Sequence, residues 1–430
     1  MYFLYNILLL LAAIVGLPYY LLKMIFTGKY RQSLIPKLGG RQKQNLAGLK
    51  KAPRVWIHAV SVGEVTAATP IVASLKKMRP EVEIIFSTST ETGQEMAHRL
   101  VKESVTFIYF PLDIPCVVRK VIRLVQPDVF SMVETELWPN FLKACRVRHI
   151  KTVMVNGRIS PRSFRKYKLT KFFWKRLLAD VSAAGMIAPI DAERIISIGM
   201  AAEKIKILGN AKYDALAALA SPQMREEIDR LFKVQKNERF FVAGSTHAGE
   251  EEVVIEVYLE LIKNYPDFKL IIVPRHIERA KAVLELLHKN NLHDFVTFTE
   301  MKNGKDRRNQ RVIVVDTIGV LFKVYALATI VYCGGSLVPK GGQNILEAAA
   351  WGKVIFYGPS MEDFSAEADL LEKAGAGTTI RNAGELLYGI RTALENPAER
   401  EQRAARGKAI VAANMGAAVR YAELINKHLG

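Results

Sequence analysis

"RVWIHAVSVGEV", residues 54–65, contains the pattern from which the fold can be predicted. A short run of β-branched and aromatic residues leads into the turn Ser61-Val-Gly-Glu64. Apolar residues then recur at helical spacing, at Val65, Ala68, Ile71, Val72 and Leu75. The order of strand, tight turn and helix is typical of a parallel sheet wrapped by helices.

The same alternation continues along the chain. Further strand-like runs in the first half are 83–89, 106–112, 127–133, 151–157 and 204–210. A second series begins at 239–246 and continues at 268–275, 311–316, 329–335 and 353–359. Because 430 residues are also too many for one compact core, we predict an α/β protein with two Rossmann-like domains.

The domain boundaries follow from composition. Residues 1–26 form a predicted membrane anchor and 27–215 the N-terminal domain. The small-residue stretch 216–223, closed by Ser-Pro, is the predicted linker. Residues 224–430 form the C-terminal domain, whose last helix could return to the first domain. We expect a ligand cleft lined by the carboxyl ends of the strands.

The chain opens with nearly continuous apolar sequence from Tyr2 to Leu22. A helix of that length reaches across a hydrocarbon core of roughly 30 Å, but Pro18 leaves open a helix that dips into one leaflet or lies in the interface. From Lys23 to Arg54 there are nine Lys or Arg and no acid. This excess predicts a single N-terminal anchor with the following domains on the cytoplasmic side.

The net charge of +19 is concentrated in Asn140–Ala179, which carries twelve Lys or Arg and no acid. Aromatic residues interleave the charges in "RKYKLTKFFWKR". The pattern suits a membrane surface, an acidic lipid or nucleic acid, while a solvated helix face is the plain alternative. The three cysteines, Cys116, Cys145 and Cys333, lack metal-ligand spacing and are expected to be reduced and buried.

Glu64 is the first acidic residue of the chain. Ser61 and Glu64 have the spacing of a capping box, in which each side chain satisfies free amides of the first helical turn, and spacing alone favours this structural role. The functional alternative is a carboxylate that takes a proton from an acceptor hydroxyl. Glu134, after the strand at 127–133, and Lys212, after the strand at 204–210, are further strand-end candidates.

In the second half, "CGGSLVPKGGQNILEAAAWG" (333–352) is the most informative stretch. Four glycines precede Asn344, which is predicted to cap a helix. The free amides and the dipole at the start of that helix favour an anion such as phosphate. Glu347 is a predicted acceptor for ribose hydroxyls, while Asn344 and Glu347 also have the spacing of a capping box, which is the structural alternative. Arg275 and His276, and the segment Ile318-Gly319-Val320, follow neighbouring predicted strands. Walker, G-x-G-x-x-G, H-E-x-x-H and Asp-x-Asp motifs are absent from the sequence, which disfavours P-loop hydrolysis and dinucleotide oxidoreduction.

Ten motifs in order resemble the 3-deoxy-D-manno-octulosonic acid (Kdo) transferases of lipopolysaccharide biosynthesis. They are the apolar N-terminus, "HAVSVGEV", "STSTETGQEMA", "FPLDIP", "VETELWPN", "NGRISPRSF", "GNAKYD", "AGSTHAGEEE", "VPRHIERA" and "GGQNILEAAAWGKVIFYGP". The resemblance implies the B-type glycosyltransferase fold and inverting transfer of one or more Kdo residues from CMP-Kdo to the lipid A precursor, lipid IVA. It implies no metal and no other cofactor.

The resemblance also implies residue roles. Glu64 matches the catalytic base, and Glu134 and Lys212 match residues that stabilise the transition state. The CMP-binding segments match Arg275, His276, Ile318, Gly319, Val320, Asn344, Ile345, Leu346 and Glu347. Two alternatives stay open: a sugar-nucleotide epimerase of the same fold, and a membrane-tethered nucleic-acid-binding protein. The resemblance favours the transferase, with inner-membrane lipid as a partner and no nucleic acid.

Overall fold

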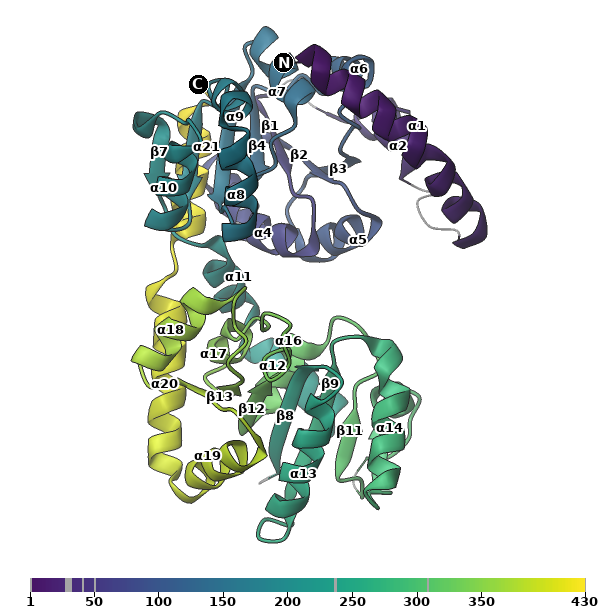
Figure 1. Cartoon of the computed structure of the whole chain (residues 1–430), viewed down its shortest axis with the longest axis vertical. Helices are drawn as coiled ribbons and strands as arrows, with labels where there is room; N and C mark the ends of the chain where they lie inside the picture. The colour runs from purple at the N-terminus through teal and green to yellow at the C-terminus, as the bar shows by residue number, and fades with distance from the viewer. Residues whose placement is uncertain are drawn as a thin grey trace. The chain divides into compact units, whose positions relative to one another are not determined.

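The computed structural model describes residues 2–27, 33–40, 42–49, 52–235, 238–307 and 309–429. The chain divides into two compact units (Figure 1). The first unit comprises Met1–Ala215 and Asn414–Gly430, and the second comprises Leu216–Ala413. The segment predicted as the linker, 216–223, is helical except at Ala220 and Ser221.

The first unit is built on a parallel sheet with the strand order β3-β2-β1-β4-β5-β6-β7 in the described residues. Its strands are β1 (Arg54–His58), β2 (Glu83–Thr88), β3 (Thr106–Tyr109), β4 (Val129–Val133), β5 (Lys151–Gly157), β6 (Ala183–Met186) and β7 (Ile205–Ile207). The order reverses between β1 and β4, and such a switch point is where open α/β sheets bind ligands at the carboxyl ends of their strands.

Helices cover both faces of this sheet. Alternation along β1 places Val55 and Ile57 on one face and Trp56 on the other. The face of Val55 packs on α4 (Val62–Met78), α5 (Glu91–Leu100) and the C-terminal helix α21 (Ala417–Lys427). The face of Trp56 packs on α6 (Pro115–Val125), α7 (Pro139–Val147), α9 (Lys171–Leu178) and α10 (Pro189–Ser197). Both sides of the sheet are therefore dry, which explains the near-continuous apolar strands.

The remaining helices of the first unit precede its first strand, connect later strands or follow its last strand along the chain. They are α1 (Tyr2–Thr27), α2 (Leu34–Lys37), α3 (Gln42–Asn45), α8 (Pro161–Leu169), the 3-10 helix η1 (Ala202–Lys204) and α11 (Ala211–Leu219), whose last residues open the second unit. α21, drawn yellow, lies among the elements of the first unit (Figure 1), where Tyr421 donates to the Gly209 carbonyl oxygen at 2.7 Å.

The second unit repeats the architecture, with the strand order β10-β11-β9-β8-β12-β13-β14 in its described part. Its strands are β8 (Arg239–Thr246), β9 (Phe268–Pro274), β10 (Phe295–Thr297), β11 (Val312–Val314), β12 (Ile330–Cys333), β13 (Val354–Tyr357) and β14 (Gly377–Thr379). All paired strands are parallel, and β8 lies at the switch point between β9 and β12.

The helices of the second unit wrap this sheet. They are α12 (Pro222–Leu231), α13 (Glu250–Ile262), η2 (Ile277–Arg279), α14 (Ala280–Lys289), α15 (Phe298–Lys302), α16 (Leu321–Leu327), α17 (Leu346–Ala350), α18 (Ser365–Lys373), α19 (Ala383–Glu395) and α20 (Pro397–Ala413). The prediction of two doubly wound α/β domains is confirmed. Three short strands, β6, β10 and β14, were not predicted.

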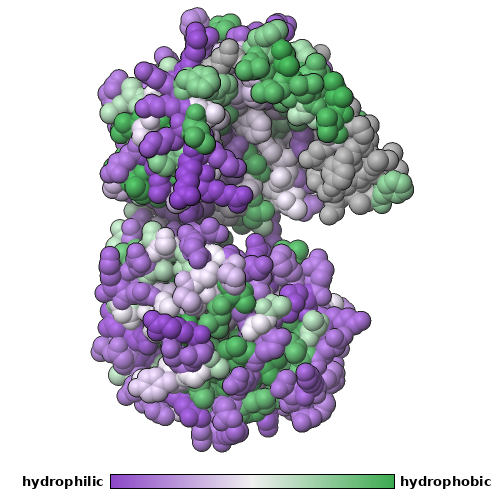
Figure 2. Space-filling view, in the orientation of Figure 1, coloured by the Kyte–Doolittle hydropathy of each residue, from purple (hydrophilic) through white to green (hydrophobic). Residues whose placement is uncertain are grey.

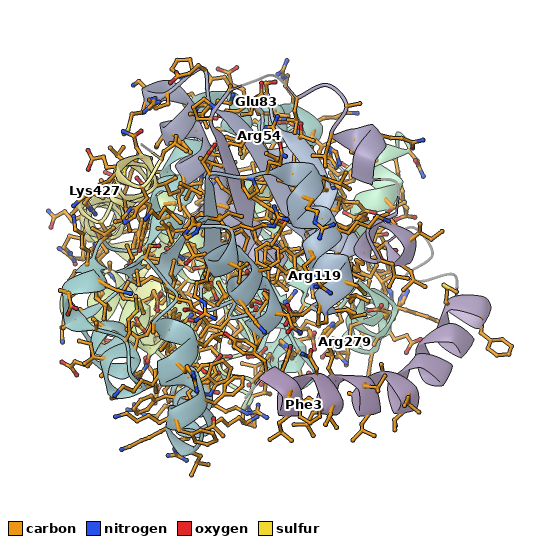
Figure 3. The ribbon with its side chains drawn as sticks, turned by 90° about the horizontal axis from the view of Figure 1, so that it is seen from above. Phe3, Arg54, Glu83, Arg119, Arg279 and Lys427 are labelled. Carbon is orange, nitrogen blue, oxygen red and sulfur yellow. The ribbon has the colours of Figure 1, made fainter. Side chains whose placement is uncertain are left out.

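α1 is docked on the first unit through its polar side. Tyr5 donates a hydrogen bond to Asp113 at 2.9 Å, and the Asn140 side chain donates to Asn6 at 2.7 Å. The opposite side carries exposed apolar residues, among them Phe3, Leu8 and Leu11. Figure 3 labels Phe3 on this side of the helix, and Figure 2 shows hydrophobic residues (green) gathered over the described part of α1. Over the ranges that the structure describes, we find no helix with both the length and the apolar character needed to cross a membrane. Part of the basic segment Lys23–Arg54 lies outside those ranges.

The cysteines follow the prediction in part. Cys145 and Cys333 are buried, as predicted. The prediction is wrong for Cys116, which is exposed because it lies in the first turn of α6, at the surface of the first unit.

Candidate active site

Glu64 lies in the first turn of α4, directly after β1, and only 6% of the residue is exposed. The predicted cap is present, because Ser61 Oγ accepts from the Glu64 amide at 3.5 Å. One oxygen of the Glu64 carboxylate accepts from the Val60 amide at 2.7 Å, and the other accepts from the Ser61 hydroxyl at 2.9 Å. Each oxygen keeps room for a further donor, since a carboxylate accepts about four hydrogen bonds.

Burial is the main reason that the pKa of Glu64 is raised to about 7. Hydrogen bonds from Val60 and Ser61 lower this pKa, while the charges of Glu134 and Glu136 raise it. The pKa of Glu136 is itself raised to about 7, first by burial and then by Glu134. A carboxyl group that titrates near neutral pH is well matched to accepting a proton from a hydroxyl. The cap and the proton acceptor are thus compatible roles for one side chain.

Glu134 and Lys212 come together beside Glu64. The Lys212 ammonium lies 3.1 Å from a carboxylate oxygen of Glu134, and a Cβ added at Gly63 would lie 3.9 Å from the same ammonium. Glu134 follows β4, the neighbour of β1, so both carboxylates lie at the switch point of the first sheet. Glu134 has a φ of 58°, in the left-handed region that a glutamate rarely adopts. Such strain is concentrated at functional sites.

Asn156 supports Lys212 and was missed as a site residue. It is the penultimate residue of β5 and has a φ of 51°, and its side-chain oxygen accepts from the Ala211 amide at 2.9 Å. The Lys212 amide in turn donates to the Asn210 side chain at 3.0 Å. The start of α11, and with it the lysine, is therefore fixed to the sheet. "NGRISP" and "GNAKYD" contain these residues, but the contact spans 55 positions of the chain.

In the second unit the predicted residues share the carboxyl edge of the sheet. Arg275 and His276 follow β9 and are exposed, and the Arg275 amide donates to the Thr246 carbonyl oxygen at the end of β8. The segment 318–320 follows β11, the neighbour of β9. Gly319 has a φ of 84° and Ile318 is 79% exposed. This loop therefore presents an apolar side chain of the kind that can pack on a planar ring.

Asn344 and Glu347 contact each other through their side chains, but the N-cap position of α17 falls on Ile345 and not on Asn344 as predicted. The Asn344 side chain donates to Glu347 at 3.4 Å and accepts from the Leu346 amide at 3.3 Å. Burial raises the pKa of Glu347 to about 7, against the opposing effects of Asn344 and the Arg275 charge. Ile345 and Leu346 have buried side chains, so only their backbone atoms can face a ligand.

The predicted anion site at the Asn344 helix needs correction. α17 has five residues, too few to build a substantial dipole. The N–H groups of the four glycines are also occupied: Gly334 donates to the Gly244 carbonyl oxygen, Gly335 to Glu250, Gly341 to the Ser360 hydroxyl and Gly342 to the Gly335 carbonyl oxygen. The glycines therefore serve close backbone packing. The cationic Arg275 is the stronger candidate for a phosphate contact.

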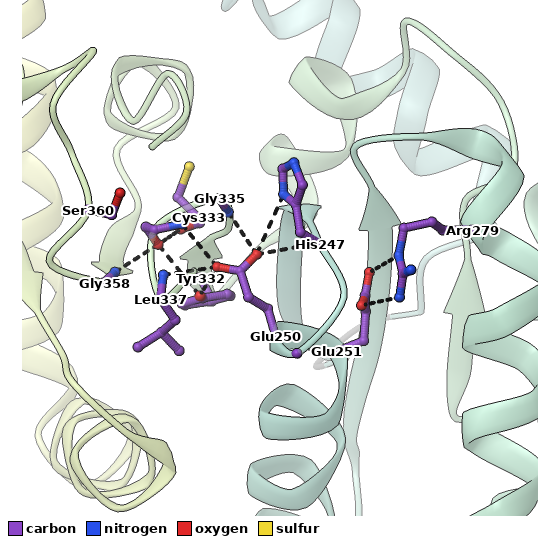
Figure 4. A network of polar contacts seen from close by, with 12 residues as sticks. His247, Glu250, Glu251, Arg279, Tyr332, Cys333, Gly335, Leu337, Gly358 and Ser360 are labelled. Carbon is purple, nitrogen blue, oxygen red and sulfur yellow. Dashed lines mark hydrogen bonds and ion pairs between the residues drawn. The ribbon is translucent and has the colours of Figure 1, made fainter. Parts of the chain in front are cut away.

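Two further residues at this edge, His247 and Glu250, escaped prediction (Figure 4). The His247 and His276 rings lie 5.8 Å apart in an edge-to-face arrangement, and burial lowers the pKa of His247. Glu250 is completely buried. Its carboxylate accepts hydrogen bonds from the His247 amide, just after β8, and from the Ser336 amide, just after β12. The next residue, Glu251, is buried as well and pairs with Arg279 at 2.8 Å.

A groove of about 500 Å³ opens between α8 and α10 of the first unit. Its lining residues are Pro161, Phe164, Arg165, Lys168, Ile190, Glu193, Arg194 and Ser197. None of the predicted site residues lines it. The α8 side of the groove belongs to the basic stretch 140–179. In that stretch Tyr167 and Phe173 pack against Trp174, while Phe172 is 79% exposed. Packing thus accounts for most, but not all, of the interleaved aromatics.

Comparison with known proteins places these residues in a family context. Residues 31–215 match the family model described as 3-deoxy-D-manno-octulosonic-acid transferase (kdotransferase). The chain is 32% identical over 429 residues to the 3-deoxy-D-manno-octulosonic acid transferase of Haemophilus influenzae, covering 99% of this chain and 98% of that protein.

It is also 33% identical over 384 residues to a bifunctional glycosyltransferase/methyltransferase of Fusobacterium nucleatum. That match covers 88% of this chain and 59% of the longer protein. Among solved structures, UDP-GlcNAc 2-epimerase from Neisseria meningitidis matches with a TM-score of 0.60 and 14% identity over 87% of this chain and 99% of that one. At this identity the likeness shows a shared fold alone.

Proposed function

The chain belongs to the 3-deoxy-D-manno-octulosonic acid (Kdo) transferase family, and on this premise we propose that it transfers Kdo from CMP-Kdo to a lipid A precursor, lipid IVA. The observation that carries the proposal is the group of Glu64, Glu134 and Lys212 at the switch point of the first sheet. Family membership disfavours the epimerase and nucleic-acid alternatives.

The second unit is the proposed donor-binding unit. Arg275 supplies a cationic guanidinium for the single phosphate of CMP, and Glu347 supplies a carboxyl group for ribose hydroxyls. Arg275 follows β9 and Glu347 follows β12, so both lie toward the carboxyl edge of the same sheet, where one nucleotide is proposed to bind. Charge that develops on the departing CMP phosphate is then stabilised by a cation already in place.

Glu64 is the proposed catalytic base. Its carboxylate takes the proton of an acceptor hydroxyl while the hydroxyl oxygen forms a bond to the anomeric carbon of Kdo. The bond from that carbon to the CMP phosphate oxygen breaks, and CMP leaves with the electron pair. One carboxylate is sufficient for this direct, inverting displacement.

Lys212 and Glu134 are the proposed electrostatic partners of this step. When Glu64 accepts a proton it loses its negative charge. The ion pair of Lys212 and Glu134, at 3.1 Å, keeps its two charges in place during this step. A preorganised charge near a developing charge lowers the barrier because it needs no reorganisation during the reaction.

The first unit is also proposed to rest on the inner membrane, from the cytoplasmic side. The docked helix α1 turns its polar side inward and exposes apolar side chains, among them Phe3, Leu8 and Val15. A basic pocket of about 250 Å³ at the start of α1 is lined by Tyr2, Lys143, Arg146 and Arg176. An apolar helix face beside cations is the arrangement of an interfacial helix on anionic lipid.

The direct test is incubation of the full chain with CMP-Kdo and lipid IVA, followed by mass spectrometry of the lipid and measurement of released CMP. We expect lipid carrying one or more Kdo residues, with CMP released only when acceptor is present. CMP release without any mass change in the lipid would show hydrolysis and would contradict the proposal. Titration with CMP and with RNA at rising salt tests the nucleic-acid alternative, since phosphate-backbone binding falls steeply with salt.

A further inference from the structure

Glu250 holds together the carboxyl edge of the second sheet. Its carboxylate accepts five hydrogen bonds (Figure 4). One oxygen accepts from the amides of His247 at 2.9 Å and Gly335 at 2.7 Å. The other accepts from the Tyr332 hydroxyl at 2.8 Å and from the amides of Ser336 and Leu337, both at 3.0 Å.

This arrangement ties two strands at the switch point. Glu250 begins α13, just after β8, whereas residues 335–337 follow β12. A completely buried carboxylate is tolerated only when it is fully hydrogen-bonded, and here three consecutive amides of one loop supply the bonds. Conversely, those amides have no role in the sheet, so the loop conformation depends on the carboxylate.

The close approach of β8 to β12 explains the glycine of this turn. A Cβ on Gly334 would lie 2.7 Å from the Ser245 carbonyl oxygen and 2.9 Å from the Glu250 carboxylate. Ser245 itself has a φ of 55°. The missing side chain at Gly334 and the positive φ of Ser245 both serve the packing around Glu250.

The loop fixed by Glu250 reaches the residues assigned to the donor. The Gly335 carbonyl oxygen accepts from the Gly342 amide at 2.8 Å, which sets the chain two residues before Asn344. On its other side, Gly335 lies against the His247 ring, where an added Cβ would be 3.3 Å from the ring carbon, and His247 packs edge-to-face on His276. A single carboxylate thus connects the backbone next to Asn344 with the pair His247 and His276.

We propose that Glu250 is a positioning residue of the CMP-Kdo site, which acts on the donor through the 335–337 loop and His247 without touching it. The inference rests on the proposed function, since it takes residues 275–276 and 344–347 as the donor site. A ligand contacting those residues binds best when their spacing is set in advance.

Glu250→Gln tests this directly. The amide nitrogen of glutamine cannot accept a hydrogen bond, so in either orientation at least two of the five donors lose their acceptor. We expect the Kd for CMP and the KM for CMP-Kdo to rise by about tenfold or more, which corresponds to about 1.4 kcal/mol. The KM for the lipid acceptor should stay unchanged, and the ³¹P resonance of bound CMP should shift.

The matched control is Glu238→Gln. Glu238 immediately precedes β8, at the opposite end of the strand, and its 9%-exposed carboxylate pairs with Arg307 at 2.6 Å and Lys269 at 2.7 Å. This variant should lose thermal stability and keep wild-type CMP affinity. A folded Glu250→Gln protein with wild-type Kd and donor KM would overturn the proposal.

A second variant covers the case in which Glu250→Gln is insoluble. Glu250→Asp keeps the charge but shortens the side chain, and should show a donor KM between wild type and the glutamine variant; a wild-type donor KM would again overturn the inference. Failure of the proposed function is distinguishable, because then the wild-type chain itself would neither bind CMP nor transfer Kdo.

Discussion

The Lys212 ammonium lies 3.1 Å from the Glu134 carboxylate, although 78 residues separate them in the chain. β1 and β4 are neighbours in the sheet, so the turn after β4 brings this ion pair next to the turn that carries Glu64. Both charged side chains are about one quarter exposed. An ion pair this accessible contributes little to stability, in the range of about 0–1 kcal/mol, so its arrangement suggests a role in the reaction.

Replacing Glu64, the proposed catalytic base, should abolish Kdo transfer and leave CMP binding unchanged. In Glu64→Gln the side chain keeps its shape and one acceptor oxygen but cannot take a proton. We expect kcat for Kdo transfer to fall by about 10²–10⁴, the usual contribution of a general base. Isothermal titration with CMP should give wild-type affinity, because Glu64 lies in the first unit and the residues proposed to bind the donor lie in the second. Wild-type turnover would reject the assignment of the base.

The pH profile of kcat/KM should report the raised pKa of Glu64. The carboxyl group is inactive as a base while protonated, so activity should rise with pH through about 7 and level off above it. Ser61→Ala removes a hydrogen bond that lowers this pKa, and should move the rising limb to higher pH. Glu136→Gln removes a charge that raises it, and should move the limb to lower pH. Shifts in the same direction for both variants would contradict the assignment.

Lys212→Met should separate catalysis from stability. We expect kcat to fall at least about tenfold, since a fixed charge near the reacting group is lost. The melting temperature should change little, because the pair with Glu134 is partly exposed. Lys269→Met is the control: its ammonium is 13% exposed and pairs with Glu238 at 2.7 Å, so stability should fall while transfer stays intact. The reverse pattern would make Lys212 a structural residue.

The sequence was sufficient for most of the fold because the strands of doubly wound domains are buried on both faces and read as apolar runs. β6 was missed because it is Ala-Ala-Gly-Met, four buried residues without a β-branched side chain. β10 and β14 are three residues each and lie at the edges of their sheet. Strands this short give too little pattern to separate them from turns.

Those residues of the proposed site that stand at strand ends, such as Glu64, Glu134 and Arg275, could be singled out from the sequence. Glu250 was missed for a physical reason. Three consecutive glutamates at a helix start look like a solvated first turn that favours the dipole. Only the fold shows that Glu250 is buried, since its partners in the loop lie 85 to 87 positions away. Likewise, the glycines 334–342 suggested an open backbone, whereas their amides are used within the protein.

Membrane binding should depend on the exposed side of α1. Leu8 and Leu11 are 56% and 54% exposed on the helix whose other side is held by Tyr5 and Asn6. Burying a leucine side chain contributes about 1.5–3 kcal/mol, so Leu8→Asp with Leu11→Asp should lower partitioning onto anionic phospholipid vesicles by about tenfold or more in a flotation assay. Ile207→Asp, at a 52%-exposed apolar residue of β7, is the control and should bind as wild type. Raised salt should weaken binding of the wild-type chain only in part, because the apolar contribution is not screened whereas the basic residues are. Equal binding of all three proteins would show that α1 does not contact lipid.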